Sequence, residues 1–403
     1  MQVKNIIVYN DYGHIYGGAG KIAFDSALAL AQKGYHVLFF CATGPVDSQL
    51  EAHGIEVVFL NQADVLSDKN KMASACRNIW NRKAYRESLK CLAQYSPQDT
   101  VVMVHGYVKT LSAAIFSTFR KRQFKTILTL HDYFTACPNG GFFNYQKNAY
   151  CTCKAMSTRC VLTHCDSRNY AYKLYRCVRQ SVLNHCLRRA KKYIHAYAVS
   201  KLCEEKLRPY VTQFATKSGV LYNPIEIITN EKIDITHNDA FLYVGRLSEE
   251  KGIHDFCKVV TELQLKGIVL GDGYLLDDLK HQYPNITFAG WVNGSDKMAY
   301  IKQAKCLIFP SKVNETFGLS VAEMLSMGVP CIVPLGCGAV ELIQPNGNGL
   351  TYKMGDYDGL KAAVEQFNQT EIATWAERMA TQQLPDFSMA TYLSNVERIF
   401  NTL

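Results

Sequence analysis

The sequence predicts an α/β protein built from two doubly wound domains, and three observations carry that prediction. Short, almost continuously apolar runs alternate with helix-like stretches along most of the chain, a pattern typical of parallel sheets covered by helices. The alternation starts afresh after Asn223-Pro224. A length of 403 residues also leaves room for two domains of ordinary size.

The first half of the chain predicts a parallel sheet with one long interruption. Residues 19–34 fit a helix that ends at Gly34. Residues 131–190 depart from the alternation and are rich in Cys, Tyr, Arg and Asn. We expect them as an insertion in a first domain that spans residues 1–221, and their aromatic content argues against disorder. Short buried strands are predicted at residues 5–9, 37–40, 57–60, 101–104 and 126–130.

The second half repeats the pattern in a domain expected over residues 222–387. Asn223-Pro224 is predicted to be a hinge, because proline interrupts regular structure and biases the residue before it toward an extended shape. The polar stretch at residues 226–238 fits the edge of a linker. Strands are predicted at residues 241–244, 267–270, 286–288, 306–309 and 330–333.

Charge is distributed unevenly along the chain, whose net charge is +9. Residues 1–221 hold 30 Lys and Arg against 13 Asp and Glu, whereas residues 222–403 hold 14 against 22. This asymmetry predicts that the first half meets an anionic partner, such as nucleic acid, an anionic membrane face or a pyrophosphate.

Composition argues against a membrane-spanning or secreted protein. No apolar run approaches the roughly 20 residues of a membrane-spanning helix. Residues 1–9 lead directly into a strand-like run without the features of a secretory signal, so we expect a cytoplasmic protein. Its 15 cysteines are then expected to be mostly free thiols.

Two glutamates eight positions apart, Glu315 and Glu323, are the strongest chemical signal. A loop after an apolar strand carries Glu315, and the helix that follows carries Glu323. Backbone N–H groups at a helix start bind anions, and carboxylates accept hydrogen bonds from sugar or ribose hydroxyls. The segment therefore fits a nucleotide-sugar. The structural alternative is a capping box formed by Ser320 and Glu323, a common feature of helix starts.

A glycine-rich loop at residues 16–21 joins the first strand to the first helix, and three interpretations compete. A P-loop fails, because Ile15 stands where its first glycine belongs. A dinucleotide fingerprint fits loosely, because Gly18-x-Gly20-x-x-Ala23 has its spacing. Against it, the loop after Tyr9 is too long and no acidic residue ends the second strand. We favour a glycine-rich lip that faces a phosphate bound mainly by the other domain.

Arg246 and Lys251 follow a predicted strand in the second half. Their spacing suits one pyrophosphate, with Arg as a fork and Lys as a point charge. The alternative is an ordinary solvated charge run. The position after a strand's carboxyl end favours a ligand site, because α/β sheets bind ligands there.

Together these motifs resemble those of the family-4 glycosyltransferases, whose fold is GT-B. The resemblance implies two Rossmann-like doubly wound domains facing a central cleft, with a last helix at residues 388–403 that crosses back to the first domain. It covers nearly the whole chain, through Gly17-Gly18, His105, His131, Ala198-Val199-Ser200, Asn223-Pro224, Gly245-Arg246, Lys251-Gly252, Gly271-Asp272-Gly273, the glutamate pair and Gly336-x-Gly338 with Glu341.

The resemblance implies a role for each residue of the second-domain site. Arg246 and Lys251 neutralise the donor diphosphate, and Glu323 holds the ribose hydroxyls. Glu315 grips the transferred sugar and its phosphate, together with the backbone amides of Phe317, Gly318 and Leu319.

For the first domain, the resemblance implies that Gly17 and Gly18 contact the diphosphate and that His131 lies beside the donor sugar. The expected catalytic residues are therefore His131, Arg246, Lys251 and Glu315. The resemblance further implies retention of anomeric configuration, with no cofactor and no metal required. Cys337 and Val340 stand in a loop that is more regular in the family, which leaves the donor sugar open.

We therefore expect an enzyme that transfers a sugar from a nucleotide-diphospho-sugar donor to a glycan or a lipid-diphosphate-linked saccharide, in surface polysaccharide biosynthesis. A sugar-nucleotide epimerase or a phosphorylase on the same fold is an alternative. A non-catalytic sugar- or membrane-binding protein is another. A nicotinamide-dependent enzyme is the weakest, for want of the ribose-binding acid.

The predicted insertion carries two further signals. Cys137, Cys151, Cys153, Cys160 and Cys165 fall close together, but their spacing lacks the paired CxxC of a zinc knuckle. We favour free thiols over a structural zinc site. Beyond them, basic residues alternate with tyrosines, and no fold that reads nucleic acid accompanies them. We expect peripheral contact with an anionic membrane and no nucleic acid; the basic residues are Arg168, Lys173, Arg176, Arg179, Arg188, Arg189, Lys191 and Lys192.

Overall fold

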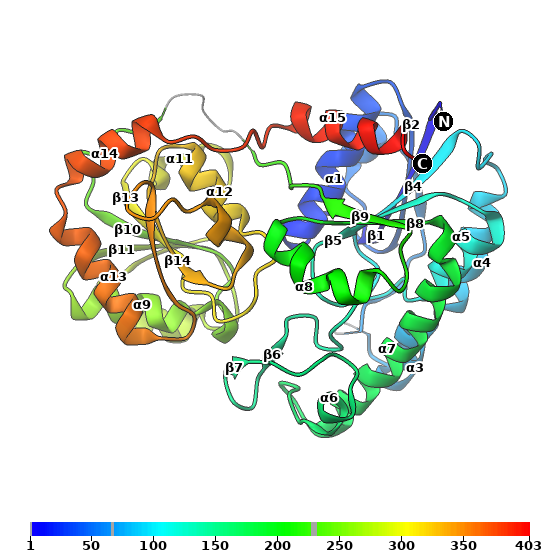
Figure 1. Ribbon diagram of the computed structural model, residues 1–403, viewed down its shortest axis with the longest axis horizontal. Coiled ribbons are helices and arrows are strands. Elements are labelled where there is room, and N and C mark those ends of the chain that lie inside the picture. The colour runs from blue at the N-terminus through cyan, green and yellow to red at the C-terminus, as the bar shows by residue number, and fades with distance from the viewer. Residues whose placement is uncertain (1, 66–67, 227–231) are drawn as a thin grey trace. The chain divides into compact units, whose positions relative to one another are not determined.

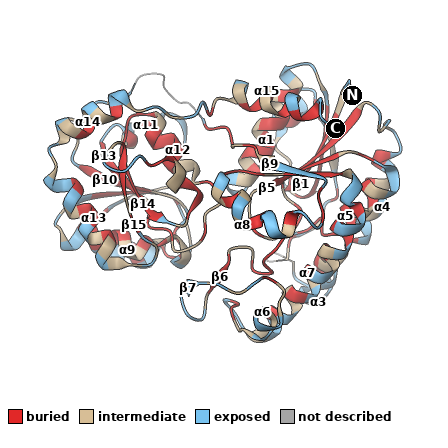
Figure 2. Cartoon of the chain, viewed as in Figure 1, coloured by how far each residue is buried: buried red, intermediate tan, exposed pale blue. Residues whose placement is uncertain are grey.

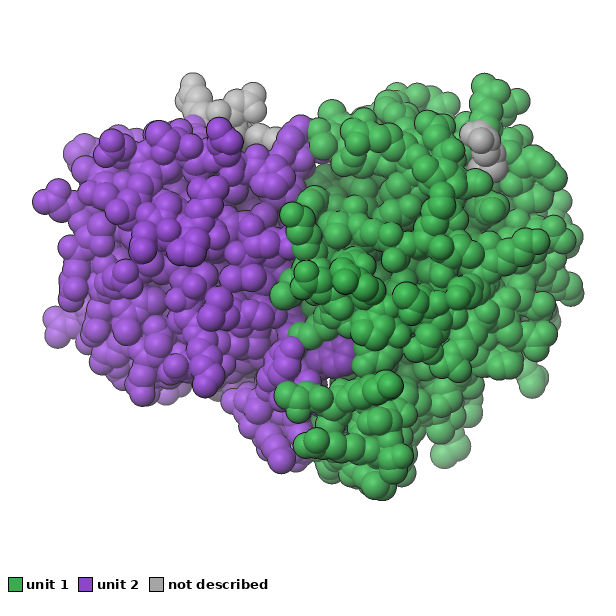
Figure 3. Space-filling view, in the orientation of Figure 1, with its two compact units in different colours: residues 1–141, 152–224, 389–403 green, residues 142–151, 225–388 purple. Residues whose placement is uncertain are grey.

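The structure is a computed structural model that describes residues 2–65, 68–226 and 232–403. The chain forms two compact units, coloured separately in Figure 3. Unit 1 comprises Met1–Gly141, Thr152–Pro224 and Met389–Leu403, and unit 2 comprises Phe142–Cys151 and Ile225–Ser388. Part of the predicted linker at residues 226–238, namely 227–231, lies outside the described residues.

Unit 1 is built on a seven-stranded sheet in the order β3-β2-β1-β4-β5-β8-β9. All of its strand pairs are parallel, and most of its central strands are buried along their whole length because helices cover the sheet (Figures 1 and 2). The strands are β1 (Asn5–Tyr12), β2 (His36–Thr43), β3 (Glu56–Phe59), β4 (Thr100–Val104), β5 (Thr126–Leu130), β8 (Ile194–Ala198) and β9 (Lys217–Val220).

One core cluster of unit 1 joins the two ends of the chain. Helix α1 (Gly17–Gln32) packs on β1 and β2, and α15 (Met389–Phe400) packs against α1. Figure 1 shows α1 and α15 side by side. The remaining helices are α2 (Ser48–Ala52), α3 (Lys71–Ile79), α4 (Arg82–Leu92), α5 (Ala114–Arg122), α6 (Thr158–Leu162), α7 (Tyr170–Ala190) and α8 (Lys201–Val211), with the 3-10 turn η1 (Lys191–Tyr193).

The predicted insertion folds into local elements of its own. Its longest element is α7, and α7 packs against α3 and α5. One part departs from the prediction, because Phe142–Cys151 groups with unit 2 and not with the first domain. This segment is a hairpin of β6 (Phe143–Asn144) and β7 (Ala149–Tyr150), and the Phe142 carbonyl accepts a hydrogen bond from Asn314 at 3.5 Å.

Unit 2 has a six-stranded sheet in the order β12-β11-β10-β13-β14-β15, again with parallel pairs throughout. Phe367 packs edge-on against Phe241 and stacks on Trp375, which anchors two helices to the sheet. The strands are β10 (Ala240–Val244), β11 (Lys266–Leu270), β12 (Thr287–Gly290), β13 (Ala304–Ile308), β14 (Cys331–Leu335) and β15 (Gly349–Lys353). The helices are α9 (Ile253–Glu262), α10 (Leu276–Gln282), α11 (Gly294–Ile301), α12 (Leu319–Ser326), α13 (Tyr357–Gln369) and α14 (Ile372–Thr381), with 3-10 turns η2 (Glu249–Lys251) and η3 (Gly338–Leu342).

The predicted class, α/β with two parallel doubly wound sheets, is confirmed. In the part of the chain that the structure describes, no helix is long and apolar enough to cross a membrane. No disulfide bond occurs in the described part of the chain.

Candidate functional site

The site residues of unit 2 gather where β10 and β13 end. These two strands are parallel neighbours at the centre of the sheet, so the loops that follow them emerge at the same edge. The first loop carries Arg246 and Lys251, and the second carries Glu315. This carboxyl edge is where α/β sheets bind ligands.

Gly252 lets the two loops approach each other. Its φ is +72°, and a Cβ atom at this position would lie 1.9 Å from the carbonyl oxygen of Pro310. Beside this contact, the Lys312 N–H donates to the Glu250 carbonyl at 2.9 Å. Only glycine fits this close approach. The next residue in the chain toward the N-terminus, Lys251, is therefore held next to the loop that carries Glu315.

Lys251 and Glu315 form an ion pair through Lys251 Nζ and Glu315 Oε1. Ser311 Oγ donates to the same carboxylate oxygen at 2.9 Å. The backbone of Glu315 is also fixed, since its carbonyl accepts from the Gly338 N–H at 2.7 Å. The structure thus brings together two predicted site residues and the glycine loop after β14.

Arg246 lies differently from Lys251. Its guanidinium donates to Glu250 at 2.7 Å, and its side chain is 62% exposed. The pair Arg246–Glu250 leaves this arginine at the surface of the loop. Its convergence with Lys251 on one pyrophosphate stays a prediction.

Helix α12 begins without a side-chain cap. Gly318 precedes it at φ +96°, and this N-cap residue provides no side-chain hydrogen bond to the backbone N–H groups of the first turn. The capping box expected as the structural alternative for Glu323 is therefore wrong. Glu323 instead accepts from Lys297 Nζ at 2.7 Å, across to helix α11.

Two buried side chains, those of Cys337 and Phe317, pack beneath the loops at this edge of the sheet. Burial, together with the nearby Glu315 carboxylate, raises the pKa of Cys337 to about 12, and its thiol donates to the Pro334 carbonyl. Cys337 is fully buried, so this residue supports the loop from within. Phe317 is likewise buried and packs edge-on against Phe387.

In unit 1, Gly17 and Gly18 open helix α1. Strand β1 continues to Tyr12, so the loop before the helix is short, and the long loop expected after Tyr9 is wrong. Gly17 has a φ of +71° with open space around its Cβ position. Tyr16 precedes the helix without capping it through its side chain. The backbone of this turn is accessible, as a glycine lip requires.

His131 follows β5 and faces His105, which follows β4. Their rings stack at 5.2 Å between centroids, with His105 Nδ1 2.9 Å from His131 Nε2. Burial lowers the pKa of His105 to about 4, and burial together with His105 lowers the pKa of His131. One ring donates and the other accepts, and the lowered pKa values favour the neutral form of both imidazoles at neutral pH.

Asp11 is a structural anchor that the sequence did not reveal. Its buried carboxylate accepts from the backbone N–H groups of Lys109, Thr110 and Leu111 at 2.7 to 2.9 Å. Burial raises the pKa of this carboxyl. Asp11 thus fixes the loop that follows β4 and His105, and an acidic residue at the end of a strand was its only signal.

Cys160 and Cys165 of the insertion lie close to a buried lysine. Lys173 is 1% exposed, and its Nζ lies 3.5 Å from Cys160 Sγ. Asn139 donates to Cys165 Sγ at 3.2 Å. Within residues 2–65, 68–226 and 232–403, no group of three or more His, Cys, Asp or Glu is arranged to hold a metal ion.

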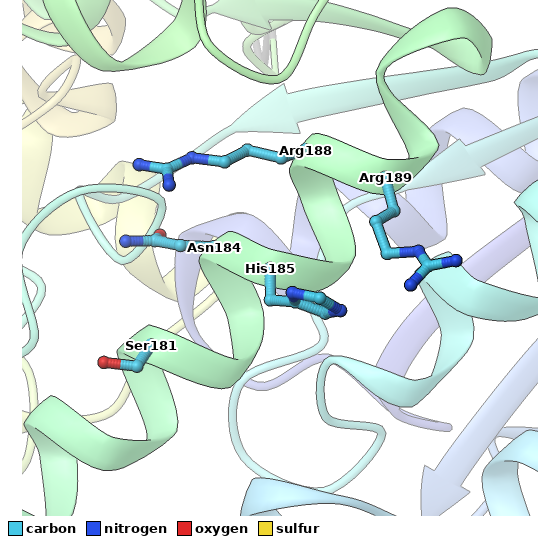
Figure 4. A pocket seen from close by; sticks show the side chains of 5 residues that line it. All are labelled: Ser181, Asn184, His185, Arg188 and Arg189. Atoms are coloured by element: carbon cyan, nitrogen blue, oxygen red, sulfur yellow. The ribbon is translucent and has the colours of Figure 1, made fainter.

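An open recess of about 340 Å³ lies on helix α7. All its lining residues come from the second half of that helix (Figure 4). Because α7 leads through η1 into the start of β8, the recess lies toward the amino edge of the sheet, away from the strand ends that carry the site residues. Its lining residues are Ser181, Asn184, His185, Arg188 and Arg189.

Comparison with solved structures identifies the fold. The structure of HepE from Anabaena in complex with UDP superposes with a TM-score of 0.69, covering 100% of both chains at 15% sequence identity. The fold is GT-B. At this level of identity the likeness establishes the GT-B fold alone.

Sequence comparison points to glycosyltransferases. Residues 228–382 match the family "Glycosyl transferases group 1". A GDP-mannose-dependent alpha-mannosyltransferase of Corynebacterium glutamicum is 29% identical over 124 residues, which cover 30% of each chain. The lipopolysaccharide 1,6-galactosyltransferase of Escherichia coli K12 is 25% identical over 198 residues, 45% of this chain and 54% of its own. The matched part thus spans between about a third and a half of the length of these relatives.

Proposed function

We propose that this GT-B protein is a retaining glycosyltransferase that moves a sugar from a nucleotide-diphospho-sugar to a glycan or lipid-linked saccharide in surface polysaccharide biosynthesis. The observation that carries the proposal is the arrangement at the carboxyl edge of unit 2. There two lysine–glutamate pairs, Lys251–Glu315 and Lys297–Glu323, flank the uncapped start of helix α12. The family match at residues 228–382 covers the same residues.

Each group has a chemical task in this proposal. The backbone N–H groups at the start of α12 and the ammonium of Lys251 suit a diphosphate. Glu315 and Glu323 accept hydrogen bonds from hydroxyls of the transferred sugar and of the ribose. Arg246 would have to leave Glu250 to reach the diphosphate, and its high exposure makes that movement cheap.

The proposed reaction breaks the bond between the anomeric carbon and the diphosphate on the face where the acceptor hydroxyl attacks. The new glycosidic bond forms on that face, the departing phosphate oxygen takes the acceptor's proton, and the nucleoside diphosphate leaves. No general base is required. Catalysis then comes from positioning and from charge stabilisation of the leaving group by Lys251 and Arg246. Neutral His131 would donate to or accept from a sugar hydroxyl beside the reacting carbon.

The first test is nucleotide binding by calorimetry with UDP, GDP, ADP, dTDP and NAD. We expect one nucleoside diphosphate to bind, and Lys251→Ala to weaken it by about tenfold or more, because hydrogen bonds to charged groups are worth roughly 1.5–3 kcal/mol. Lys266→Ala is the matched control, since Lys266 pairs with Asp239 at the amino end of β11, the opposite edge of the same sheet.

The same experiment separates the alternatives. Binding of NAD alone, or of no nucleotide, would contradict the proposed donor site. Nucleotide binding without sugar transfer to any saccharide acceptor, but with interconversion of the donor sugar, would favour an epimerase. Nucleotide binding with neither reaction would favour a binding protein on the same fold.

We further propose that helix α7 contacts an anionic membrane, which suits a lipid-linked acceptor. Apolar side chains are exposed along its first half and on the preceding helix, with Leu162 70%, Leu174 41% and Val178 54% exposed. Basic side chains follow at Arg188, Arg189, Lys191 and Lys192. Exposed apolar groups and basic residues on one helix favour the interface of an anionic bilayer, at about 1 kcal/mol per basic residue.

Liposome flotation tests this contact. Replacing the four basic residues by Gln is expected to abolish co-flotation with vesicles that contain phosphatidylserine, and vesicles of phosphatidylcholine alone should bind neither protein. Replacement of four exposed lysines of unit 2 by Gln, namely Lys258, Lys266, Lys280 and Lys302, removes the same number of charges and controls for net charge. Undiminished flotation of the α7 variant would rule out this surface.

A further inference from the structure

Lys297 was not among the expected site residues, although it is the partner of Glu323. It lies on α11, 26 positions before Glu323 in the chain. Both side chains are largely buried, at 15% exposure for Lys297 and 10% for Glu323. Among the described residues, Lys297 is the one side-chain partner that this carboxylate has.

The ion pair restricts where the Glu323 carboxylate can point. A glutamate side chain has several rotatable bonds, and a ligand that must order it loses affinity in doing so. Lys297 engages Oε2 at 2.7 Å, so the carboxylate is already oriented before a ligand arrives. A carboxylate has about four acceptor positions, which leaves enough of them for a pair of neighbouring hydroxyls.

Lys297 also neutralises the charge of the Glu323 carboxylate. A largely buried carboxylate is costly unless it is paired. An unpaired one would in addition repel a diphosphate bound at the start of the same helix. The ammonium of Lys297 cancels this charge and still leaves the carboxylate able to accept hydrogen bonds from hydroxyls.

We propose that Lys297 is a positioning residue that holds Glu323 in the orientation and charge balance needed to bind the 2′- and 3′-hydroxyls of the donor ribose. The inference rests on the proposed nucleotide-sugar donor. On this inference, the Lys297–Glu323 pair makes the protein select a ribose that carries both hydroxyls, whereas Lys251 binds the diphosphate.

The test compares ribonucleotides with their 2′,3′-dideoxy counterparts. UDP, GDP and ADP, each with its dideoxy analogue, are titrated calorimetrically into the wild type, Lys297→Met and Lys297→Arg. For the base that binds, we expect Lys297→Met to weaken the ribonucleotide by about tenfold, the size of a charge-assisted hydrogen bond, and to leave the dideoxynucleotide within about twofold. Lys297→Arg keeps the cation and should restore most of the preference for ribose.

Glu323→Gln shows whether Lys297 acts through the glutamate. In that background the preference for ribose should already be lost, and adding Lys297→Met should change it no further. A further loss would mean that Lys297 touches the hydroxyls itself, and this would overturn the positioning role. Lys361→Met is the control for breaking a lysine–glutamate pair between helices, since Lys361 joins α13 to Glu262 of α9 at 3.0 Å.

The remaining outcomes are also decisive. Equal weakening of both nucleotides by Lys297→Met, or no weakening, would overturn the inference while the proposed donor site stands. Lower thermal stability of Lys297→Met with an unchanged preference for ribose would reduce the pair to a structural contact. Failure of every nucleotide to bind the wild type would instead remove the proposed function.

Discussion

At the scale of single residues, the paired histidines of unit 1 predict a measurable pH dependence. Burial lowers the pKa of His105 to about 4, whereas an unfolded histidine titrates near 6.5. Between these values the unfolded chain binds a proton that the folded chain excludes. Stability from this group is therefore complete above about pH 6.5 and is lost as the pH falls toward 4.

Replacing His105 by Gln removes that linkage. As the pH falls from 6.5 to 4, the free energy of unfolding of His105→Gln minus that of the wild type should rise by up to about 1.4 kcal/mol for each pH unit. The difference between the two proteins reports the histidine pair, because His105 also lowers the pKa of His131. Groups outside the pair that titrate in this range cancel, among them Asp132, whose pKa burial raises to about 6. Denaturant unfolding at half-unit pH intervals measures it, and a difference independent of pH would contradict the buried neutral pair.

The sequence reveals a site residue when the role of that residue depends on its neighbours in the chain, and misses it when the role depends on distant residues. Glu315 and Lys251 stand in loops that directly follow apolar strands, so a parallel sheet predicts that both lie at its carboxyl edge. The strand order of the structure then pairs them. Lys297 gave no such signal, because a lysine within a helix is almost always solvated. Only the tertiary fold, which brings this residue of α11 to α12, makes it the partner of Glu323.

At the scale of elements, the close approach of two loops in unit 2 predicts the cost of adding one methyl group. Gly252→Ala would place Cβ 1.9 Å from the Pro310 carbonyl oxygen, which forces the loop of Lys251 away from the loop of Glu315. We expect unit 2 to lose several kcal/mol of stability, beyond the roughly 1 kcal/mol that a left-handed backbone costs alanine. Nucleotide affinity should fall with it.

Gly54→Ala is the matched control for backbone strain. Gly54 has a φ of +71° with nothing within 4 Å of its Cβ position, so this variant adds the backbone cost without the collision. Thermal unfolding of both variants compares the two costs. Equal destabilisation would show that the contact with Pro310 is unimportant.

The same scale explains which strands the sequence predicted. The central strands β4 and β5 are buried along their whole length and read as continuous apolar runs. The pattern of short apolar runs does not predict β8, β9 or β15. β9 (Lys217–Val220) lies at the edge of its sheet and is half exposed, so its sequence carries polar residues and glycine. β8 contains His195, and a buried histidine interrupts the apolar pattern without interrupting the strand.

At the scale of the whole molecule, the chain returns to its first unit after completing the second. Helix α15 contributes Tyr392, Leu393, Val396 and Phe400 to the core cluster that contains α1, β1 and β2. Stability of the first unit therefore depends on the last residues of the chain. A protein of two such units is not expected to unfold in a single two-state transition.

Phe400→Ala tests this dependence. Phe400 is 2% exposed and packs edge-on against Tyr35, so its truncation should cost unit 1 about 3–5 kcal/mol. Hydrogen exchange is the measurement: amides of β1 and β2 should lose protection, whereas those of β10 and β13 should keep it. Glu397→Gln on the same helix breaks the partly exposed pair with Lys33 and should cost no more than about 1 kcal/mol. Loss of protection in β10 and β13 with β1 and β2 unchanged would mean that α15 stabilises the second unit instead, because each sheet reports the stability of its own core.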